Sequence, residues 1–485
     1  MAEQLPSVGQ FAAAFEDFII AMSQAAERPE ARLVARLREH LGVEPSGVPV
    51  TAATFGVAER PNLQLALDAV VLEREAFGLA NPHVMMDGVG FAQLLSRPGR
   101  GFPSGEAPVE YADVEVGDGR VVRCIASALL LTSFEDEPVA LIVGSTGRHH
   151  PMEPMQVRVE GIAPREGTIS RLLQALRKAM REHNVFRGKV FSLTPMGSVT
   201  FPVIPRVTQD AVVLPQGTLE RLEHHAIAIA EHAEELRAAG RHLKRGVLLH
   251  GPPGTGKTLT VSYLLTATEG RTTVLLTGQA LGQIAQAFAI ARDLVPATVV
   301  LEDVDLVAAE RTMPGAHGGV LFELLNQLEG LAEDSDLLVV LTTNRPDLVE
   351  PALAARPGRV DLALELPLPD EHARRRLMRL YAGQIELDED IERQLVERSE
   401  GATGALIKEL MRQATLRAAV NRTAVSAADV AKILDGLLEE RAVLTRRLLG
   451  QPPGSDGPPS PPPPGMVRAF GAAGLPIPPD FYTGQ

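Results

Sequence analysis

The chain of 485 residues contains one cysteine, no tryptophan and four tyrosines. A single thiol, Cys124, excludes a disulfide framework and any metal site built from several cysteines, and it favours a reducing compartment. We expect Cys124 to be a core residue, because it lies in an apolar run typical of a strand. So few aromatic side chains also leave little to stack against the bases of a single-stranded nucleic acid.

Basic residues are in the minority, since 47 Lys and Arg stand against 61 Asp and Glu, for a net charge of −14. This balance disfavours capture of nucleic acid through its phosphates, so we expect no such partner. No apolar run approaches the ~18 residues of a membrane-spanning helix, and the first residues carry acids where a secretory signal carries bases. The sequence therefore predicts a cytoplasmic, multidomain protein without a membrane span.

Four regions of the chain differ in pattern. Residues 1–204 mix helical periodicity with strand-like alternation, which predicts an α+β domain and a candidate region for recognition of a partner. Residues 205–368 alternate short apolar strands with helices, a pattern typical of a parallel sheet sandwiched by helices. Residues 369–450 are helical in pattern and predict a smaller subdomain. Residues 451–485 hold 11 prolines, which is typical of a disordered tail, either a tether or a proline-rich ligand.

Within residues 205–368, strands are expected at 246–250, 272–277, 298–301, 337–341 and 360–366. Within residues 369–450, helices are expected at 373–381, 391–399, 405–420 and 426–449. The basic string Arg374-Arg375-Arg376 lies in the first of these helices. We expect it to form a solvated helix face.

A glycine-rich loop joins the first of these strands to a helix. Its sequence is Gly251-Pro252-Pro253-Gly254-Thr255-Gly256-Lys257-Thr258, which fits G-x-x-x-x-G-K-[ST]. Such a loop turns backbone N–H groups toward phosphate oxygens, and the helix N-terminus adds a partial positive charge. Lys257 would reach the β- and γ-phosphates, and the Thr258 hydroxyl would bind Mg²⁺. The alternative is a glycine-rich turn without a ligand, and the strand–loop–helix context argues against it.

Polar side chains follow the third and fourth of these strands. Thr298-Val299-Val300-Leu301 leads into Glu302-Asp303-Val304-Asp305, where one carboxylate can hold Mg²⁺ while its neighbour activates the attacking water. An acidic loop without a function is the alternative, which the phosphate loop disfavours. Asn344 could hydrogen-bond the γ-phosphate or the water. Asn344-Arg345-Pro346-Asp347 is close to the guanine-reading N-K-x-D, but Arg stands in place of Lys.

Taken in this order, the motifs resemble the AAA family of ATPases, over roughly residues 205–440. Residues 348–361 are similar to that family's second region of homology, whose two arginines, here Arg356 and Arg359, reach the γ-phosphate bound by a neighbouring subunit. Residues 401–405 keep the family's lid pattern. The resemblance places Gly404 and Ala405 close to the nucleotide and implies ATP and Mg²⁺ as ligands.

Within the family, residues 240–250 and the order Glu302-Asp303 are similar to the group that contains the mitochondrial inner-membrane translocase for the Rieske protein. That group has a membrane helix, and no such helix is expected here. The resemblance assigns Glu302 to the metal and Asp303 to activation of water. It makes Lys257, Glu302, Asp303, Asn344, Arg356 and Arg359 the expected catalytic residues.

The sequence thus predicts Mg²⁺-dependent hydrolysis of ATP to ADP and phosphate in a homo-oligomeric ring, coupled to remodelling or translocation of an unidentified protein partner. The alternative is a nucleotide-gated assembly switch or scaffold with slow or no turnover. Residues 278–283 lack the aromatic side chain that many AAA unfoldases place in their central pore, which favours the switch. The two arginines favour remodelling.

Overall fold

The computed structural model describes residues 15, 32–79, 90–95, 106–145, 156–305, 319–330, 332, 335–347, 360–383, 385, 389–422, 425 and 427–448. The chain forms two compact units. The first comprises residues 1–203, 269–300 and 335–337, and the second comprises residues 204–268, 301–334 and 338–485. The domain limits expected at residues 204, 368 and 450 stay predictions.

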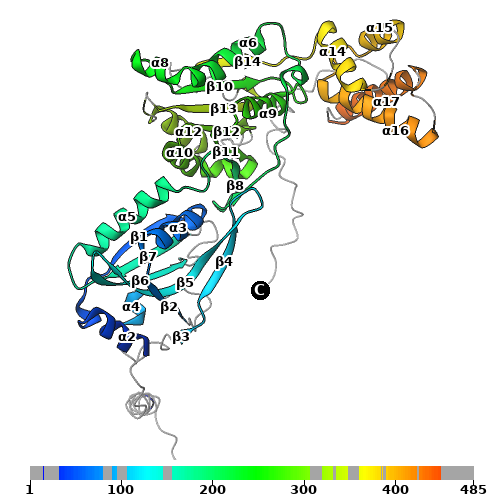
Figure 1. The fold of residues 1–485 in the computed structure, drawn as a ribbon. Helices are drawn as coiled ribbons and strands as arrows, with labels where there is room; N and C mark the ends of the chain where they lie inside the picture. The colour runs from blue at the N-terminus through cyan, green and yellow to red at the C-terminus, as the bar shows by residue number, and fades with distance from the viewer. Residues whose placement is uncertain are drawn as a thin grey trace, which may run out of the picture. The chain divides into compact units, whose positions relative to one another are not determined.

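The first unit contains a seven-stranded antiparallel sheet in the order β1-β7-β6-β5-β2-β3, with β4 paired to β5 (Figure 1). Its strands are β1 (Thr51–Gly56), β2 (Arg74–Leu79), β3 (Glu106–Ala107), β4 (Glu110–Glu115), β5 (Val121–Phe134), β6 (Glu137–Ser145) and β7 (Gln156–Ile162). Cys124 is fully buried in β5, and burial raises the pKa of its thiol to about 11, as suits a core residue.

Helices cover both faces of this sheet. One core contains side chains of α3 (Arg60–Val70) and α5 (Thr168–Glu182), and the other contains side chains of α2 (Arg32–Leu41) and α4 (Phe91–Leu94). Ala128 and Leu130 of β5 point into the first core, whereas Leu129 and Leu131 point into the second. Because both faces are covered, the strand is apolar at every position here rather than at every second one.

The remaining elements of the first unit include β8 (Val190–Leu193), which pairs in parallel with β11 (Thr272–Thr277) and antiparallel with β9 (Val199–Thr200). The 3₁₀ segment η5 (Gly278–Gln283) and α10 (Ile284–Asp293) follow β11. The division between the units falls within β12 (Ala297–Glu302) and β13 (Leu337–Thr343).

In the second unit, β10 (Arg245–His250) lies between β13 and β14 (Leu362–Glu365) and runs parallel to both. Residues 245–249 are all buried, as expected for a strand in the middle of a parallel sheet. The helices of this part are α6 (Thr218–Glu223), a π-helical turn (His224–Ala228), α7 (Ile229–Glu231), α8 (Ala233–Ala238), α9 (Lys257–Ala267) and α12 (Gly319–Glu329).

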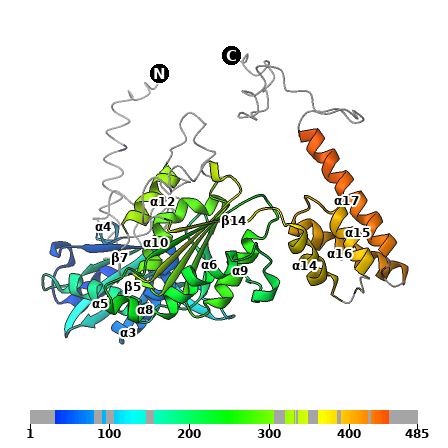
Figure 2. The same cartoon turned by 90° about the horizontal axis from the view of Figure 1, so that it is seen from above.

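Four helices form the lid of the second unit, grouped together in Figure 2: α14 (Glu371–Ala382), α15 (Glu389–Arg398), α16 (Gly404–Asn421) and α17 (Ala427–Leu448). Their apolar faces share one core, which includes Met378, Val396, Ile407 and Leu434. The expectation for Arg374 is wrong. Its side chain is buried, and its guanidinium donates to the carbonyls of Val396 and Pro369. Carbonyl groups at a helix end or in a loop have no partner within a helix, so a buried arginine can supply the donor.

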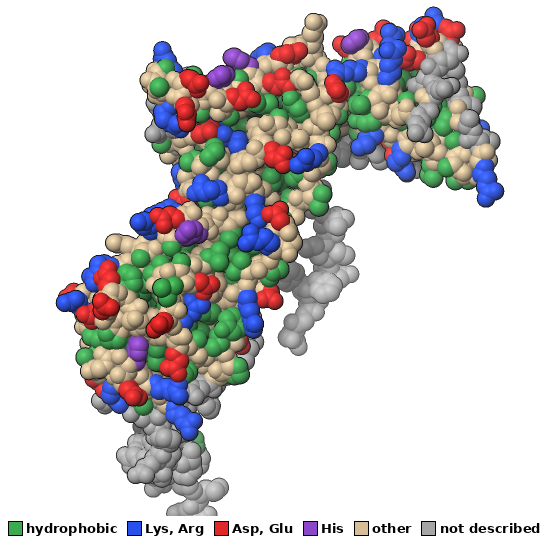
Figure 3. Space-filling view, viewed as in Figure 1, with side chains coloured by type: hydrophobic (Ala, Val, Ile, Leu, Met, Phe, Trp, Pro, Cys, Tyr) green, Lys and Arg blue, Asp and Glu red, His purple; other side chains and the backbone are tan. Residues whose placement is uncertain are grey.

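The surface carries charges of both signs. Figure 3 shows acidic and basic side chains interspersed over the face in view, without a continuous basic stripe on that face. None of the described helices is long and apolar enough to cross a membrane.

Candidate active site

The glycine-rich loop lies between the end of β10 and the start of α9, as the sequence predicts. Gly251, Gly254 and Gly256 all have positive φ, at +146°, +80° and +103°. A β-carbon on Gly251 would lie 2.2 Å from the backbone oxygen of Leu366, so this position tolerates only glycine. The turn places the loop directly before the free N–H groups of the first turn of α9.

Lys257 begins α9 and folds back over the loop. Its ammonium donates to the carbonyl oxygens of Gly251 and Pro252, at 2.8 and 2.9 Å. Burial lowers the pKa of this side chain, while the nearby charges of Asp303 and Asp305 act in the opposite direction. The lysine is therefore a partly desolvated cation inside the bend of the loop, where the added negative charge of a phosphate would stabilise its charged form.

Thr258 and Glu302 meet where a metal ion is expected. The Thr258 hydroxyl hydrogen-bonds the Glu302 carboxylate, which lowers the pKa of Glu302. Burial raises this pKa and has the larger effect. The Oε1 atom of Glu302 is buried and has no hydrogen-bond partner among the described residues. A buried carboxylate oxygen without a partner, beside a hydroxyl, is a donor set that fits Mg²⁺.

Asp303 and Asn344 are joined by a hydrogen bond from Asn344 Nδ2 to Asp303 Oδ1, at 3.1 Å. Asp303 has a φ of +52°, a left-handed conformation that is uncommon outside glycine and is frequent at functional sites. Its N–H donates to the hydroxyl of Thr342 at 3.0 Å, which holds the backbone in that conformation. The Asp303 carboxylate and the Asn344 amide are therefore held next to each other in the wall of one cavity.

The lid contacts the loop through the beginning of α16. The N–H of Ala405 donates to the carbonyl of Gly254 at 3.1 Å, and the Thr403 side chain caps the helix by accepting from the N–H of Leu406. A β-carbon on Gly254 would lie 3.0 Å from the Thr403 hydroxyl. Gly404 and Ala405 thus sit against the loop.

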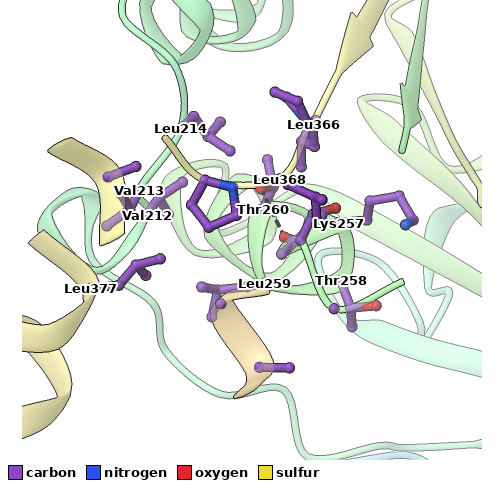
Figure 4. A pocket seen from close by; sticks show the side chains of 18 of the residues that line it. Val212, Val213, Leu214, Lys257, Thr258, Leu259, Thr260, Leu366, Leu368 and Leu377 are labelled. Carbon is purple, nitrogen blue, oxygen red and sulfur yellow. Dashed lines mark hydrogen bonds between the residues drawn. The ribbon is translucent and has the colours of Figure 1, made fainter. Parts of the chain in front are cut away.

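A cavity of about 560 Å³ connects these groups. Its polar end contains residues 253–258, Asp303 and Asn344, and its apolar end contains residues 211–215, Leu377 and Tyr381. Figure 4 shows Val212, Val213 and Leu214 on one side of the cavity and Lys257 and Thr258 on another. Lys408 also lines the cavity, with its ammonium 5.9 Å from the centre of the Tyr381 ring.

Most of the expected site residues are brought together. Lys257, Thr258, Asp303, Asn344, Gly404 and Ala405 all line the cavity, and the Glu302 carboxylate is hydrogen-bonded to Thr258. Arg356 and Arg359 lie outside the described residues. Sequence reasoning missed residues 211–215, because a short apolar segment before the first strand carries no motif. The only signal there is an apolar run, Ala211-Val212-Val213-Leu214, too short to be a helix or a central strand.

Residues 247–368 match the family model described as "ATPase family associated with various cellular activities (AAA)". A proteasome-activating nucleotidase of Methanocaldococcus jannaschii is 30% identical over 230 residues, which are 44% of this chain and 53% of that protein. The 26S proteasome regulatory subunit 8 of Dictyostelium discoideum is 27% identical over 320 residues, or 61% and 78% of the two chains. The subunit of the same name in Caenorhabditis elegans is 34% identical over 200 residues, or 38% and 47%.

These matches confirm the predicted fold class, a parallel sheet flanked by helices with a helical region after it. The chain spans about half the length of the first of these relatives. The relatives are named for the proteasome, and none of these three is named for the Rieske protein. The expected likeness to the translocase group therefore gains no support from them.

Proposed function

We propose that the chain hydrolyses ATP to ADP and phosphate with the help of Mg²⁺, since residues 247–368 match the model of the AAA family of ATPases. One observation carries the proposal: a glycine-rich loop, a buried lysine and a carboxylate–amide pair line the polar end of a single cavity. That combination suits phosphoryl transfer, because catalysis of this reaction consists almost entirely of positioning the reacting groups and stabilising their charge.

The residues present fit both ligands. Lys257 and the N–H groups of the loop would hold the phosphates, and Thr258 with Glu302 would hold Mg²⁺, which neutralises charge on the phosphate oxygens when it is bound. Asp303 would accept a proton from the attacking water, and Asn344, bonded to Asp303, would orient that water.

The apolar end of the cavity suits the base of the nucleotide. Val212, Leu377 and Tyr381 offer apolar and aromatic surface on which a purine ring can pack. A guanine-reading role for the Asn344-Arg345-Pro346-Asp347 segment is not supported, because Arg345 and Asp347 pair with each other at the surface, at 2.8 Å. Adenine is therefore the proposed base.

We further propose that the chain works as a homo-oligomeric ring in the cytoplasm and acts on a protein partner. The names of the relatives support the protein partner, since they describe activation or regulation of the proteasome. Arg356 and Arg359 would reach the γ-phosphate held by the next subunit, as the family resemblance implies. A proteasome-like protease is accordingly the first partner to test.

A nucleotide-gated switch with slow turnover is the second candidate. It is favoured by residues 278–283, which lack an aromatic side chain and which also pack inward: Ala280 and Leu281 are buried, and Gln283 donates to the carbonyl of Pro195. A short segment held in this way is poorly suited to gripping an unfolded chain. Turnover that rises with an added protein substrate would favour remodelling, and turnover that follows only the oligomeric state would favour the switch.

The experiment that tests the proposal compares Lys257→Ala with Lys432→Ala, which removes an exposed lysine of α17 outside the cavity. We expect Lys257→Ala to lower ATP turnover by roughly 10²-fold or more, as for other preorganised electrostatic groups, and to weaken binding of a fluorescent ATP analogue. Lys432→Ala should leave both unchanged. If Lys257→Ala behaved like Lys432→Ala, the phosphate-loop assignment would be wrong.

A further inference from the structure

Asp305 is a buried carboxylate three residues beyond Glu302, and the proposed chemistry does not use it. The residue is only 9% exposed. Its Oδ1 atom accepts two hydrogen bonds, from the hydroxyl of Thr343 at 2.9 Å and from the N–H of Asn344 at 3.1 Å. Hydrogen bonds to a charged acceptor are roughly twice as strong as neutral ones, so this carboxylate fixes the end of β13 firmly.

Asn344 is consequently held at two points. Its backbone N–H bonds Asp305, and its side-chain amide bonds the carboxylate of Asp303. Two more hydrogen bonds join residues 303–304 to β13. The N–H of Asp303 donates to the hydroxyl of Thr342, and the N–H of Val304 donates to the carbonyl of Thr342, each at 3.0 Å. Asp303 and Asn344 both line the cavity, whereas Asp305 does not.

We propose that Asp305 is a positioning residue for hydrolysis: by binding Thr343 and Asn344 it holds the Asn344 amide against the Asp303 carboxylate. The inference rests on the proposed function, because it concerns the pair that handles the attacking water. Without the Asp305 acceptor, the backbone of Asn344 could shift while the fold of the sheet persisted. A displacement of about 1 Å at such a pair can lower a rate by roughly 10²-fold.

The test uses four variants of the full chain: Asp305→Ala, Asp305→Asn, Asn344→Ala and the double variant Asp305→Ala/Asn344→Ala. We expect Asp305→Ala to lower kcat by about 10- to 100-fold with KM and ATP affinity within about 3-fold of the parent, since binding groups are untouched. Asp305→Asn keeps an oxygen acceptor and should retain turnover within about 3-fold. The double variant should lose no more than Asn344→Ala alone, because the two residues act as one unit.

A second measurement does not depend on activity. Amide hydrogen exchange of residues 341–346 without nucleotide should be faster in Asp305→Ala and close to the parent in Asp305→Asn. Glu392→Ala is the matched control, because Glu392 is also a buried carboxylate of the second unit, paired with Arg379 in the lid. It should lower stability without changing exchange at 341–346 or turnover of the folded protein.

The possible failures are distinguishable. Parent-like kcat in Asp305→Ala, additive losses in the double variant, or loss of ATP binding would overturn the positioning role and leave the proposed function standing. Equal losses in Asp305→Asn and Asp305→Ala would also overturn it, because an acceptor oxygen at position 305 would then make no difference. Absence of turnover in the parent would overturn both the proposed function and the inference.

Discussion

The surroundings of Glu302 disfavour its ionised form. Burial raises the pKa of its carboxyl group, and its Oε1 atom lacks a hydrogen-bond partner among the described residues. Without metal, the folded state therefore binds this proton more tightly than the unfolded state does. The contribution of Glu302 to stability consequently falls as the pH rises from the ordinary value of 4.5 through the raised pKa.

Metal binding reverses that preference, because Mg²⁺ binds the ionised carboxylate and must displace the proton. We expect the affinity for Mg²⁺–ATP to fall as the pH is lowered through the raised pKa of Glu302. At pH values below this pKa, the affinity should fall by about tenfold for each pH unit. Calorimetry in two buffers of different ionisation enthalpy measures the proton released.

Glu302→Gln provides the baseline for this measurement, since ATP itself also titrates. The variant should bind Mg²⁺–ATP more weakly, and its affinity should depend less on pH than that of the parent. Equal pH dependence in the two proteins would contradict the assignment of Glu302 to the metal.

The sequence predicts which residues line the candidate site but not how they are held. The spacing of Lys257 and Thr258 from the loop glycines is diagnostic, because the phosphates impose it. The left-handed conformation of Asp303 and its bond to Thr342 depend on the pairing of loop and strand ends far apart in the chain, which a local pattern does not record.

At the scale of elements, the phosphate loop depends on how closely β10 approaches the end of β14. Gly251 has a φ of +146° and its α-carbon faces the backbone of Leu366. Gly240 also has positive φ, at +65°, but has no atom within 4 Å of the position of a β-carbon. The two glycines therefore separate the cost of backbone conformation from the cost of a clash.

We expect Gly240→Ala to lower the free energy of unfolding by about 1 kcal/mol, the cost of a left-handed alanine. Gly251→Ala should lower it by roughly 3 kcal/mol or more, since a backbone atom cannot give way as a side chain can. Urea denaturation of both variants measures the difference. Similar midpoints for the two would contradict the close packing of β10 against residue 366.

Strands were predictable because they are continuously apolar, and the lid helices because their apolar residues recur at helical spacing. The observed bounds of β11 coincide with the expected 272–277, and those of α16 differ from the expected 405–420 by one residue at each end. Arg374 and residues 211–215 were not predictable. Burial of an arginine depends on carbonyls from other elements, and an apolar cavity wall depends on the lid that faces it.

At the scale of the whole molecule, the proposed ring predicts that subunits complete each other's sites. Arg356→Ala should lower turnover by 10³-fold or more while ATP affinity stays within a few-fold, because an arginine of this kind acts on the transition state. Mixing Arg356→Ala with Lys257→Ala should restore part of the activity. Each variant then supplies what the other lacks, and turnover is measured across mixing ratios.

The absence of restored activity at every ratio would count against an arginine acting between subunits. It would leave the nucleotide site itself unaffected, since Lys257 and Asp303 belong to one chain and one cavity. Sedimentation of the parent with and without Mg²⁺–ATP supplies the matching control for assembly.

We propose above all that a nucleoside triphosphate binds in the cavity between residues 251–258 and the lid. A crystal structure with Mg²⁺ and a non-hydrolysable ATP analogue tests this most directly. We expect phosphate oxygens against the N–H groups of the loop and Lys257, the metal at Thr258 and Glu302, and the adenine ring beside Val212 and Leu377. An analogue bound elsewhere, or a loop still closed on the Lys257 ammonium under saturating nucleotide, would contradict it.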